Sequence, residues 1–311
     1  CNIIKLQNQN NNDPSISNLF LLLSQIIQFI KDMKPLYCSL LCVVFYLLFP
    51  NGLNFAADIN HQTGTLCSES DNSLNEDDDF LSNLRTNMDS LADNVINRHG
   101  FYQTRVGDKK SNTVYGSVIC RGDISAGNCS NCVLNSIKVA SDDCPKSRDV
   151  SVWFRWCFLR YANQSFFGAM EETSVAVAND TDFEEAKVVA QELEFMRGIA
   201  DSASEKPFMF ETEVLDVNVT QKRYGMAQCT RDIGKEDCRR CLEAQLQNFR
   251  TVIGNKRRWE IYGVNCFMWY NDYRFYNNAS VLLSGAKRHG PRRRHTIWIC
   301  VGVLATLQMV M

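Results

Sequence analysis

Histidine is scarce in this chain, which contains only four among 311 residues. Two of them, His289 and His295, lie outside the repeated region described below, and neither His61 nor His99 recurs in the second repeat. The chain also lacks a glycine-rich phosphate loop and the HExxH and GxSxG motifs of metalloproteases and serine hydrolases. These absences argue against an enzyme within the sequence, and they do not bear on a kinase domain beyond Met311.

An excess of charge of one sign is missing as well. The chain has 33 basic and 35 acidic residues, which gives a formal net charge of −2. Composition therefore offers no support for nucleic-acid binding, and we expect no nucleic-acid partner.

Long hydrophobic runs are also absent, because none reaches the roughly 20 residues that a membrane-spanning helix needs. The run 36–49 follows Met33 and Lys34 and is followed by small residues at 56–57. A charged start, a short apolar core and a small-residue exit predict a secretory signal peptide at residues 33–57, with a buried helix or membrane anchor as the alternative. Residues 1–32 are interpreted as an upstream segment without a defined fold.

The C-terminal region is apolar from Thr296 to Met311 and follows a basic segment at residues 284–295. It predicts either the start of a transmembrane helix or a hydrophobic tail of a processed, lipid-anchored protein. A basic segment on the outer side disfavours the helix under the positive-inside rule, so both alternatives stay open. With the signal peptide, the segment predicts the secretory pathway. The predicted destination is the extracellular face of the plasma membrane or the extracellular space.

Cysteine, in contrast, is abundant, with fourteen residues, and its spacing repeats. The pattern Y-G-x-x-x-C-x8-C-x2-C begins at Tyr115 and again at Tyr224, 109 positions later. A later cysteine and its aromatic tail repeat at the same offset, from Cys157 to Cys266. The sequence therefore predicts a tandem duplication of one domain, with repeat 1 at residues 58–170 and repeat 2 at 171–283.

Two cysteines of repeat 1 have no counterpart in repeat 2. Cys144 aligns with Ile253, and Cys67 aligns near Ala176. Cysteines lost together are most simply partners in an oxidising compartment, so the sequence predicts a Cys67–Cys144 disulfide. We also expect repeat 2, without this constraint, to pack on repeat 1 through an apolar interface. The other four cysteines in each repeat allow three pairings, which spacing does not decide. They are Cys120, Cys129, Cys132 and Cys157, and then Cys229, Cys238, Cys241 and Cys266.

Zinc is the competing interpretation of the CxxC pairs. Four cysteines could supply the ligands, but the predicted secretory route favours disulfides. We expect no metal and no cofactor. The acidic run 76–79 is interpreted as the opening of a helix and not as a cation site.

Periodicity gives the coarse structure of one repeat. Apolar residues at three- and four-residue steps predict a helix over 77–100, ending near Gly100. The segments 113–120 and 151–161 are rich in β-branched and aromatic residues and predict strands, with a short helix capped by Ser130 or Asn131 between them. Repeat 2 predicts its long helix at 183–203. The fold class is α+β, with helices packed on an antiparallel sheet.

Together with "WFRWCFLRYANQSFFG" (153–168), these motifs resemble the plant ginkbilobin-homologous domain, also called the stress-antifungal or salt-stress-response domain. Tandem copies behind a signal peptide are similar to cysteine-rich repeat secretory proteins, plasmodesmata-located proteins and ectodomains of cysteine-rich receptor-like kinases. The resemblance implies two tandem disulfide-stapled domains, each with two helices on a five-stranded antiparallel sheet. It also implies five disulfides: Cys67–Cys144, Cys120–Cys129, Cys132–Cys157, Cys229–Cys238 and Cys241–Cys266.

A sugar site does not follow from the resemblance. The ginkgo member binds mannose through an Asn, an Arg and a Glu, and the matching places here hold Ser68, Ser151 and Ala162. Repeat 2 holds approximately Val177, Glu260 and Asn271, so mannose binding is not carried over and no ligand-binding residue is assigned. The four tryptophans of the repeats are predicted to pack in cores and not to stack on sugars; they are Trp153, Trp156, Trp259 and Trp269.

Glycosylation sequons agree with a secreted chain. Four are predicted sites: Asn163, Asn179, Asn218 and Asn278. A fifth, at Asn128, lies between cysteines and is expected to be less accessible. Together these features predict a non-enzymatic recognition or signalling module of a plant cell-surface protein, related to stress or defence. It would recognise an apoplastic ligand or a partner ectodomain and be tethered through its C-terminal segment. The alternative is a secreted carbohydrate-binding antifungal protein.

Overall fold

The structure is a computed structural model that describes residues 59–71, 74, 78–179 and 183–277. The predicted signal peptide, upstream segment and C-terminal apolar segment lie outside these residues. No helix in the described part of the chain is long and apolar enough to cross a membrane.

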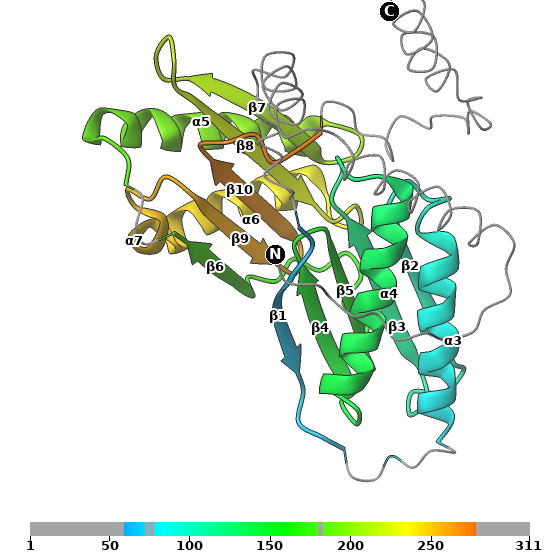
Figure 1. Ribbon diagram of the computed structural model, residues 1–311. Helices are drawn as coiled ribbons and strands as arrows, with labels where there is room; N and C mark the ends of the chain where they lie inside the picture. The colour runs from blue at the N-terminus through cyan, green and yellow to red at the C-terminus, as the bar shows by residue number, and fades with distance from the viewer. Residues whose placement is uncertain (1–58, 72–73, 75–77, 180–182, 278–311) are drawn as a thin grey trace, which may run out of the picture. The chain divides into compact units, whose positions relative to one another are not determined.

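Repeat 1 is a five-stranded antiparallel sheet with two helices on one face (Figure 1). The strand order is β1-β4-β5-β3-β2. In chain order the elements are β1 (Gln62–Cys67), α3 (Asp79–Asn94), β2 (Phe101–Val106), β3 (Val114–Cys120), α4 (Ala126–Asp143), β4 (Asp149–Phe154) and β5 (Cys157–Ala162).

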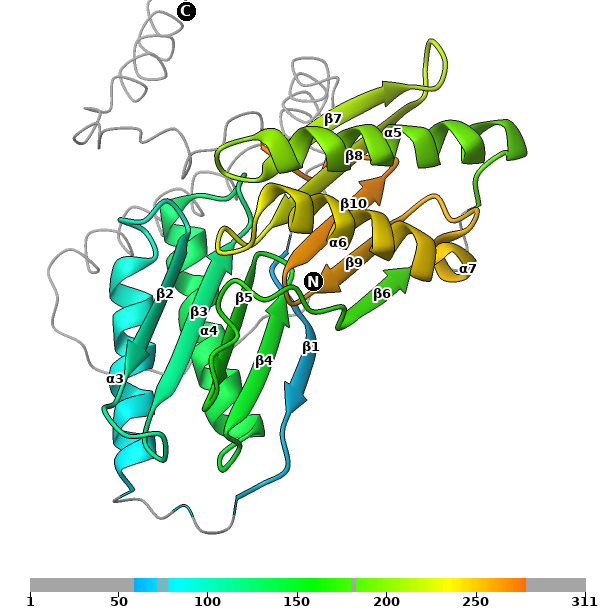
Figure 2. The same cartoon turned by 180° about the vertical axis from the view of Figure 1, so that it is seen from behind.

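Repeat 2 has the same architecture, with strand order β6-β9-β10-β8-β7 (Figure 2). Its elements are β6 (Ser174–Ala178), α5 (Ala186–Glu205), β7 (Phe210–Asp216), β8 (Lys222–Cys229), α6 (Lys235–Asn248), α7 (Arg250–Ile253), β9 (Trp259–Gly263) and β10 (Cys266–Asn271). The predicted α+β fold of two helix-covered antiparallel sheets is confirmed.

Local sequence explains where the first helix begins and ends. Asp78 caps α3 by accepting a 2.7 Å hydrogen bond from the backbone nitrogen of Phe80, which agrees with a capping role for the acidic run. The helix ends at Asn94, earlier than predicted. The following turn closes at Gly100, which has a φ of +80° and donates its backbone N–H to the carbonyl oxygen of Val95 at 2.8 Å.

Two predictions about repeat 1 were wrong. The second helix does not begin at Ser130 or Asn131, because Ser125 caps α4 and accepts a hydrogen bond from the backbone nitrogen of Asn128 at 3.2 Å. The segment 151–161 is not one continuous strand, since it turns at 155–156 into the β4–β5 hairpin. In repeat 2 the long helix begins at Ala186 and not at Phe183.

The glycine of each Y-G motif lies where a helix crosses the sheet. A Cβ atom added to Gly116 would lie 1.8 Å from Oδ1 of Asn87 on α3. A Cβ atom on Gly225 would lie 2.3 Å from Cδ1 of Ile199 on α5. Glycine is therefore required in this motif because the helix approaches the strand so closely that there is no room for a side chain.

Five disulfides staple the two sheets to their helices. They join Cys67 to Cys144, Cys120 to Cys129, Cys132 to Cys157, Cys229 to Cys238 and Cys241 to Cys266, which are the pairs that the family resemblance implied. These ten sulfurs are bonded to one another, so none of them is a thiolate that could bind zinc. No group of three or more His, Cys, Asp or Glu residues in the described ranges is arranged to hold a metal ion.

Candidate ligand site at the junction of the repeats

The helix-free faces of the two sheets meet in a shared apolar cluster. Its members from repeat 1 include Ile119, Trp153 and Phe158, and those from repeat 2 include Phe267 and Trp269. Each of these residues alternates along its strand with residues that face the helices. The predicted apolar interface between the repeats is therefore confirmed, and so is the core role of three tryptophans, since Trp153, Trp259 and Trp269 are buried.

Polar contacts seal the edge of this cluster. The amide of Gln228 uses both ends, since its Oε1 accepts from the backbone nitrogen of Gly122 at 3.1 Å and its Nε2 donates to the carbonyl oxygen of Cys120 at 3.0 Å. The indole nitrogen of Trp153 donates to the carbonyl oxygen of Gly263 at 2.8 Å. These buried groups have their hydrogen bonds only while the repeats stay together.

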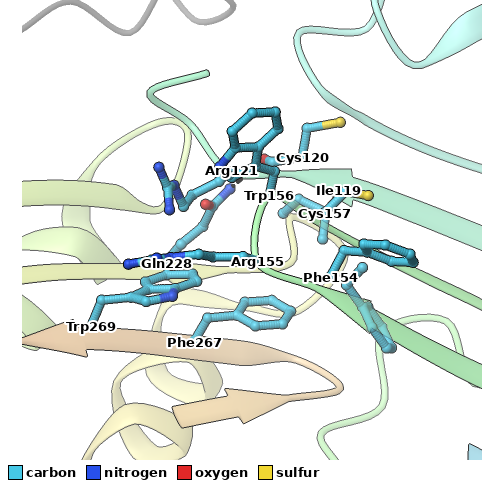
Figure 3. A pocket seen from close by; sticks show the side chains of 11 residues that line it. Ile119, Cys120, Arg121, Phe154, Arg155, Trp156, Cys157, Gln228, Phe267 and Trp269 are labelled. Atoms are coloured by element: carbon cyan, nitrogen blue, oxygen red, sulfur yellow. Dashed lines mark hydrogen bonds between the residues drawn. The ribbon is translucent and has the colours of Figure 1, made fainter. Parts of the chain in front are cut away.

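A small space lies inside the junction (Figure 3). Its lining comes from both repeats and includes Arg121, Trp156, Gln228 and Trp269. Its volume of about 10 Å³ accommodates no more than a single water molecule. Arg121 lies beside it, paired at 2.6 Å with the equally buried Asp123. This space belongs to the packing of the junction and is not a ligand site.

The junction has approximate two-fold symmetry, since residues at aligned positions meet each other across it. Phe158 and Phe267, 109 positions apart, have ring centroids 5.8 Å apart. His99 and Phe208, also 109 positions apart, have ring centroids 5.7 Å apart. A contact between equivalent residues is the signature of an isologous interface.

Reciprocal hydrogen bonds obey the same symmetry. The backbone nitrogen of Gly168 donates to Oδ2 of Asp232 at 3.1 Å. The backbone nitrogen of Asn277 donates to Oδ2 of Asp123 at 3.3 Å. Because Asp232 and Asn277 align with Asp123 and Gly168, the two bonds are the same contact made in each direction.

The open part of the junction is a groove of about 340 Å³ lined by both repeats. Ser68 and Ser151, two of the positions aligned with the sugar site, both lie in it, together with Arg160 and Glu171. The third position, Ala162, is buried and does not line it. Sequence reasoning missed Arg160 and Glu171, because their proximity depends on sheet register and on a loop that folds back.

Arg160 is the central charge of this groove. Its Nη1 lies 2.8 Å from Oε1 of Glu171, and its Nη2 lies 3.5 Å from Oδ2 of Asp149. The guanidinium also lies 4.3 Å from the ring centroid of Phe166. Burial raises the pKa of Asp149, while Arg160 opposes this rise. The result is a fixed arginine between two carboxylates, which can donate to and accept from a polar ligand.

The two serines of this groove are less available than Arg160 for binding a ligand. The hydroxyl of Ser68 accepts hydrogen bonds from the backbone nitrogens of Arg148 and Asp149, at 3.1 and 3.2 Å. Ser151 lies directly opposite Arg160 in the β4–β5 register. Glu171, the first residue of repeat 2 and the partner of Arg160 across the junction, is held in place because its backbone nitrogen donates to Oδ1 of Asn265 at 2.9 Å. The groove thus depends on the junction for its shape.

The strand register in repeat 2 shows that the sequence alignment of its first strand with that of repeat 1 was wrong by two residues. Cys67 pairs with Val150, whereas Trp259, the equivalent of Val150, pairs with Ala178 and not with Ala176. The counterpart of Ser68 is therefore Asn179 and not Val177. Glu260, at the second sugar-site position, is engaged by Arg155 of repeat 1 in a 2.8 Å ion pair. The second copy of the site is used to hold the repeats together.

Three of the predicted glycosylation sites lie in the described residues. Asn218 is exposed at the tip of the β7–β8 hairpin, while Asn163 and Asn179 are half-buried. Asn278 lies outside the described residues. The sequon at Asn128 lies in the first turn of α4.

Comparison with known proteins identifies the family. The profile of the salt stress response/antifungal family matches residues 66–164 and 172–273. The chain belongs to this family. Both copies of the salt stress response/antifungal domain thus coincide with the two stapled sheets. Relatives of the chain are secreted proteins or ectodomains, which indicates the secretory pathway.

Curated relatives differ in length. Cysteine-rich repeat secretory protein 1 of Arabidopsis thaliana is 29% identical over 202 residues, covering 61% of this chain and 57% of that protein. Antimicrobial ginkbilobin-2-like protein of Castanea crenata is 29% identical over 204 residues, covering 63% of this chain and 81% of that protein. Cysteine-rich receptor-like protein kinase 8 of A. thaliana is 28% identical over 260 residues, covering 78% of this chain. The match spans only 37% of the kinase.

A solved structure shows the same fold. The tandem DUF26 ectodomain of the A. thaliana cysteine-rich receptor-like protein PDLP8 aligns with a TM-score of 0.59 and 22% identity. The alignment covers 68% of this chain and 98% of that one. The paired arrangement of two stapled sheets is thus shared with a known ectodomain.

Proposed function

We propose that the chain is the extracellular recognition module of a plant cell-surface protein, of receptor-kinase or plasmodesmal type, with a role in stress or defence. The single observation that carries this proposal is the groove at the junction, where Arg160 stands between Asp149 and Glu171. A fixed arginine flanked by carboxylates suits an apoplastic ligand or partner ectodomain that offers hydroxyl, amide or carboxylate groups. Tethering would come from the C-terminal segment.

Fractionation of plant tissue that expresses the tagged full-length protein tests the cellular part of the proposal. We expect a membrane-bound pool that detergent releases. Recovery only in the soluble apoplastic wash would contradict the tethered form.

Binding tests the groove itself. The full chain is used to capture ligands from apoplastic extract, and Arg160→Ala is compared with Arg239→Ala, an exposed arginine on α6. We expect Arg160→Ala to lose specific capture at least tenfold and Arg239→Ala to retain it. Equal capture by the two variants would exclude the groove.

A secreted antifungal protein that binds carbohydrate is the second candidate. The observation in its favour is the chestnut antimicrobial relative, of whose length the match covers 81%. A glycan array separates the two candidates. Saturable mannose binding, together with a soluble apoplastic pool, would favour the second.

A further inference from the structure

A second groove lies in repeat 2, on the helical side of its sheet. It runs between α5 and the α6–α7 pair, which Figure 2 shows together over the sheet. Its volume is about 760 Å³, within the range of small-molecule sites. The corresponding groove of repeat 1, between α3 and α4, has only about 290 Å³.

The loss of one disulfide distinguishes the two grooves. In repeat 1, α4 runs without a break to Asp143 and is bonded to the sheet through Cys144 and Cys67. In repeat 2, the equivalent helix breaks at Phe249, and α7 places Ile253 in the groove at the position of Cys144. The groove of repeat 2 is therefore not closed by a disulfide at the position where Cys67–Cys144 joins the helix to the sheet in repeat 1.

An acid replaces an apolar residue on the floor of this groove. Glu192 aligns with Leu84 of repeat 1 and is only 3% exposed. Its Oε1 accepts a hydrogen bond from the indole nitrogen of Trp259 at 2.6 Å. Its Oε2 is buried and has no hydrogen-bond partner among the described residues. A buried polar atom without a partner is unfavourable unless a ligand or water satisfies it.

Burial keeps the Glu192 carboxyl protonated near neutral pH. Burial raises the pKa of Glu192 to about 8, while the Trp259 hydrogen bond lowers it, Glu184 raises it and Arg223 lowers it. A protonated carboxyl offers an O–H donor at Oε2. The floor of the groove can therefore donate to a carbonyl or hydroxyl oxygen.

The walls are apolar and the rim is cationic. Val189 and Leu193 on α5 face Leu246 and Ile253 across the groove. At the rim, the exposed guanidinium groups of Arg197 and Arg250 make no ion pair or hydrogen bond within the described ranges, and one anion, Glu194, also lines the groove. Two unpaired guanidinium groups above an apolar slot match an anionic head on an apolar body.

We propose that this inter-helix groove of repeat 2 binds a small amphipathic carboxylic acid. The apolar body lies between α5 and α7, and the carboxylate pairs with Arg197 and Arg250. A carbonyl or hydroxyl oxygen on the body accepts the hydrogen bond of Glu192. This site is separate from the junction groove and from the function proposed for it.

The test titrates the full chain, produced through the secretory route, with the fluorescent fatty acid dansyl-undecanoic acid. We expect saturable binding at one site per chain. Val189→Trp fills the groove and should weaken binding more than about tenfold, a loss of about 1.4 kcal/mol. The matched control is Leu81→Trp in the groove of repeat 1, which should leave binding unchanged.

A second variant protects the test against misfolding. Arg197→Glu combined with Arg250→Glu changes only exposed side chains and should also weaken binding about tenfold or more. Arg160→Ala in the junction groove should bind the probe normally, which separates this proposal from the previous one. The proposal is overturned by unsaturable binding, by equal binding to Val189→Trp and wild type, or by equal loss in Leu81→Trp.

Discussion

The indole nitrogen of Trp153, in repeat 1, donates a 2.8 Å hydrogen bond to the carbonyl oxygen of Gly263, the last residue of β9 in repeat 2. Trp153 is 5% exposed, so water cannot replace this bond while the repeats are together. The bond ties an edge of the aromatic cluster to the backbone of the opposite sheet. The apolar cluster alone would allow the two sheets to slide against each other, and this hydrogen bond fixes their relative position.

Trp153→Phe should weaken this junction. The ring is kept in part, but the carbonyl oxygen of Gly263 loses its donor, and a buried carbonyl without a partner costs about 1–3 kcal/mol. Denaturant unfolding followed by circular dichroism measures the loss. Phe183→Leu, at a side chain that is 48% exposed, is the control and should change the free energy of unfolding by less than about 0.5 kcal/mol.

Gly116→Ala should destabilise repeat 1, because its Cβ would overlap Asn87 on α3. Overpacking of this kind costs about 1–3 kcal/mol. Gly198→Ala, in the middle of α5 with no atom within 4 Å of the added Cβ, should instead raise stability by about 0.5–1 kcal/mol. Thermal melts of the two variants should move in opposite directions. A melting temperature that rises in Gly116→Ala would mean that the helix does not approach β3 as described.

Replacing Cys67 and Cys144 together by alanine should lower the free energy of unfolding by about 4–5 kcal/mol in the chain-entropy treatment of a 77-residue separation. Mass spectrometry of non-reduced peptides should show the other four bonds unchanged. A loss below about 1 kcal/mol would contradict the chain-entropy treatment for this bond.

Stability should fall as pH rises, because of Glu192. Its pKa in the folded protein is raised by burial to about 8, from an ordinary value of 4.5. The folded state therefore binds more protons than the unfolded state, and the free energy of unfolding decreases between about pH 4.5 and pH 8 by an amount on the order of a few kcal/mol.

Glu192→Gln should remove most of this slope and stabilise the protein at pH 8, since the amide keeps the size and the acceptor for Trp259. Glu194→Gln, exposed on the same helix, is the matched control and should preserve the slope. Urea unfolding at pH 5, 6, 7 and 8 makes the comparison. A wild-type protein that is as stable at pH 8 as at pH 5 would contradict a buried acid.

The fold could be predicted from the sequence because its strongest signals are local or periodic. The cysteine spacing locates both repeats, and the joint loss of two cysteines in repeat 2 predicts the Cys67–Cys144 disulfide from the sequence alone. The start of α4 was missed because Ser125, Ser130 and Asn131 can all cap a helix, and only packing selects among them. The β4–β5 turn was missed because its two residues, Arg155 and Trp156, include none of the Gly, Pro, Asn or Asp residues that usually mark a turn.

The two proposed ligand sites could not be predicted in the same way. Arg160 and Glu171 meet through a loop, and Glu192 meets Trp259 across 67 residues. Glu192 lies on the apolar face of its helix. An acidic residue in an amphipathic helix is ordinarily assigned to the exposed face, so the sequence pattern gives no sign that this one is buried. Burial of an acid is a property of packing, which spacing along the chain does not encode.

The two-fold character of the junction has a consequence for assembly. Phe158 of repeat 1 meets Phe267 of repeat 2, and His99 of repeat 1 meets Phe208 of repeat 2. Each repeat therefore presents a face that is complementary to the other repeat. A short connection holds the two faces of one molecule at high effective concentration, so they close on each other before a second molecule can compete. Were that closure to open, the same surfaces would allow two molecules to exchange repeats, and an exchanged dimer would rebuild every contact of the monomer.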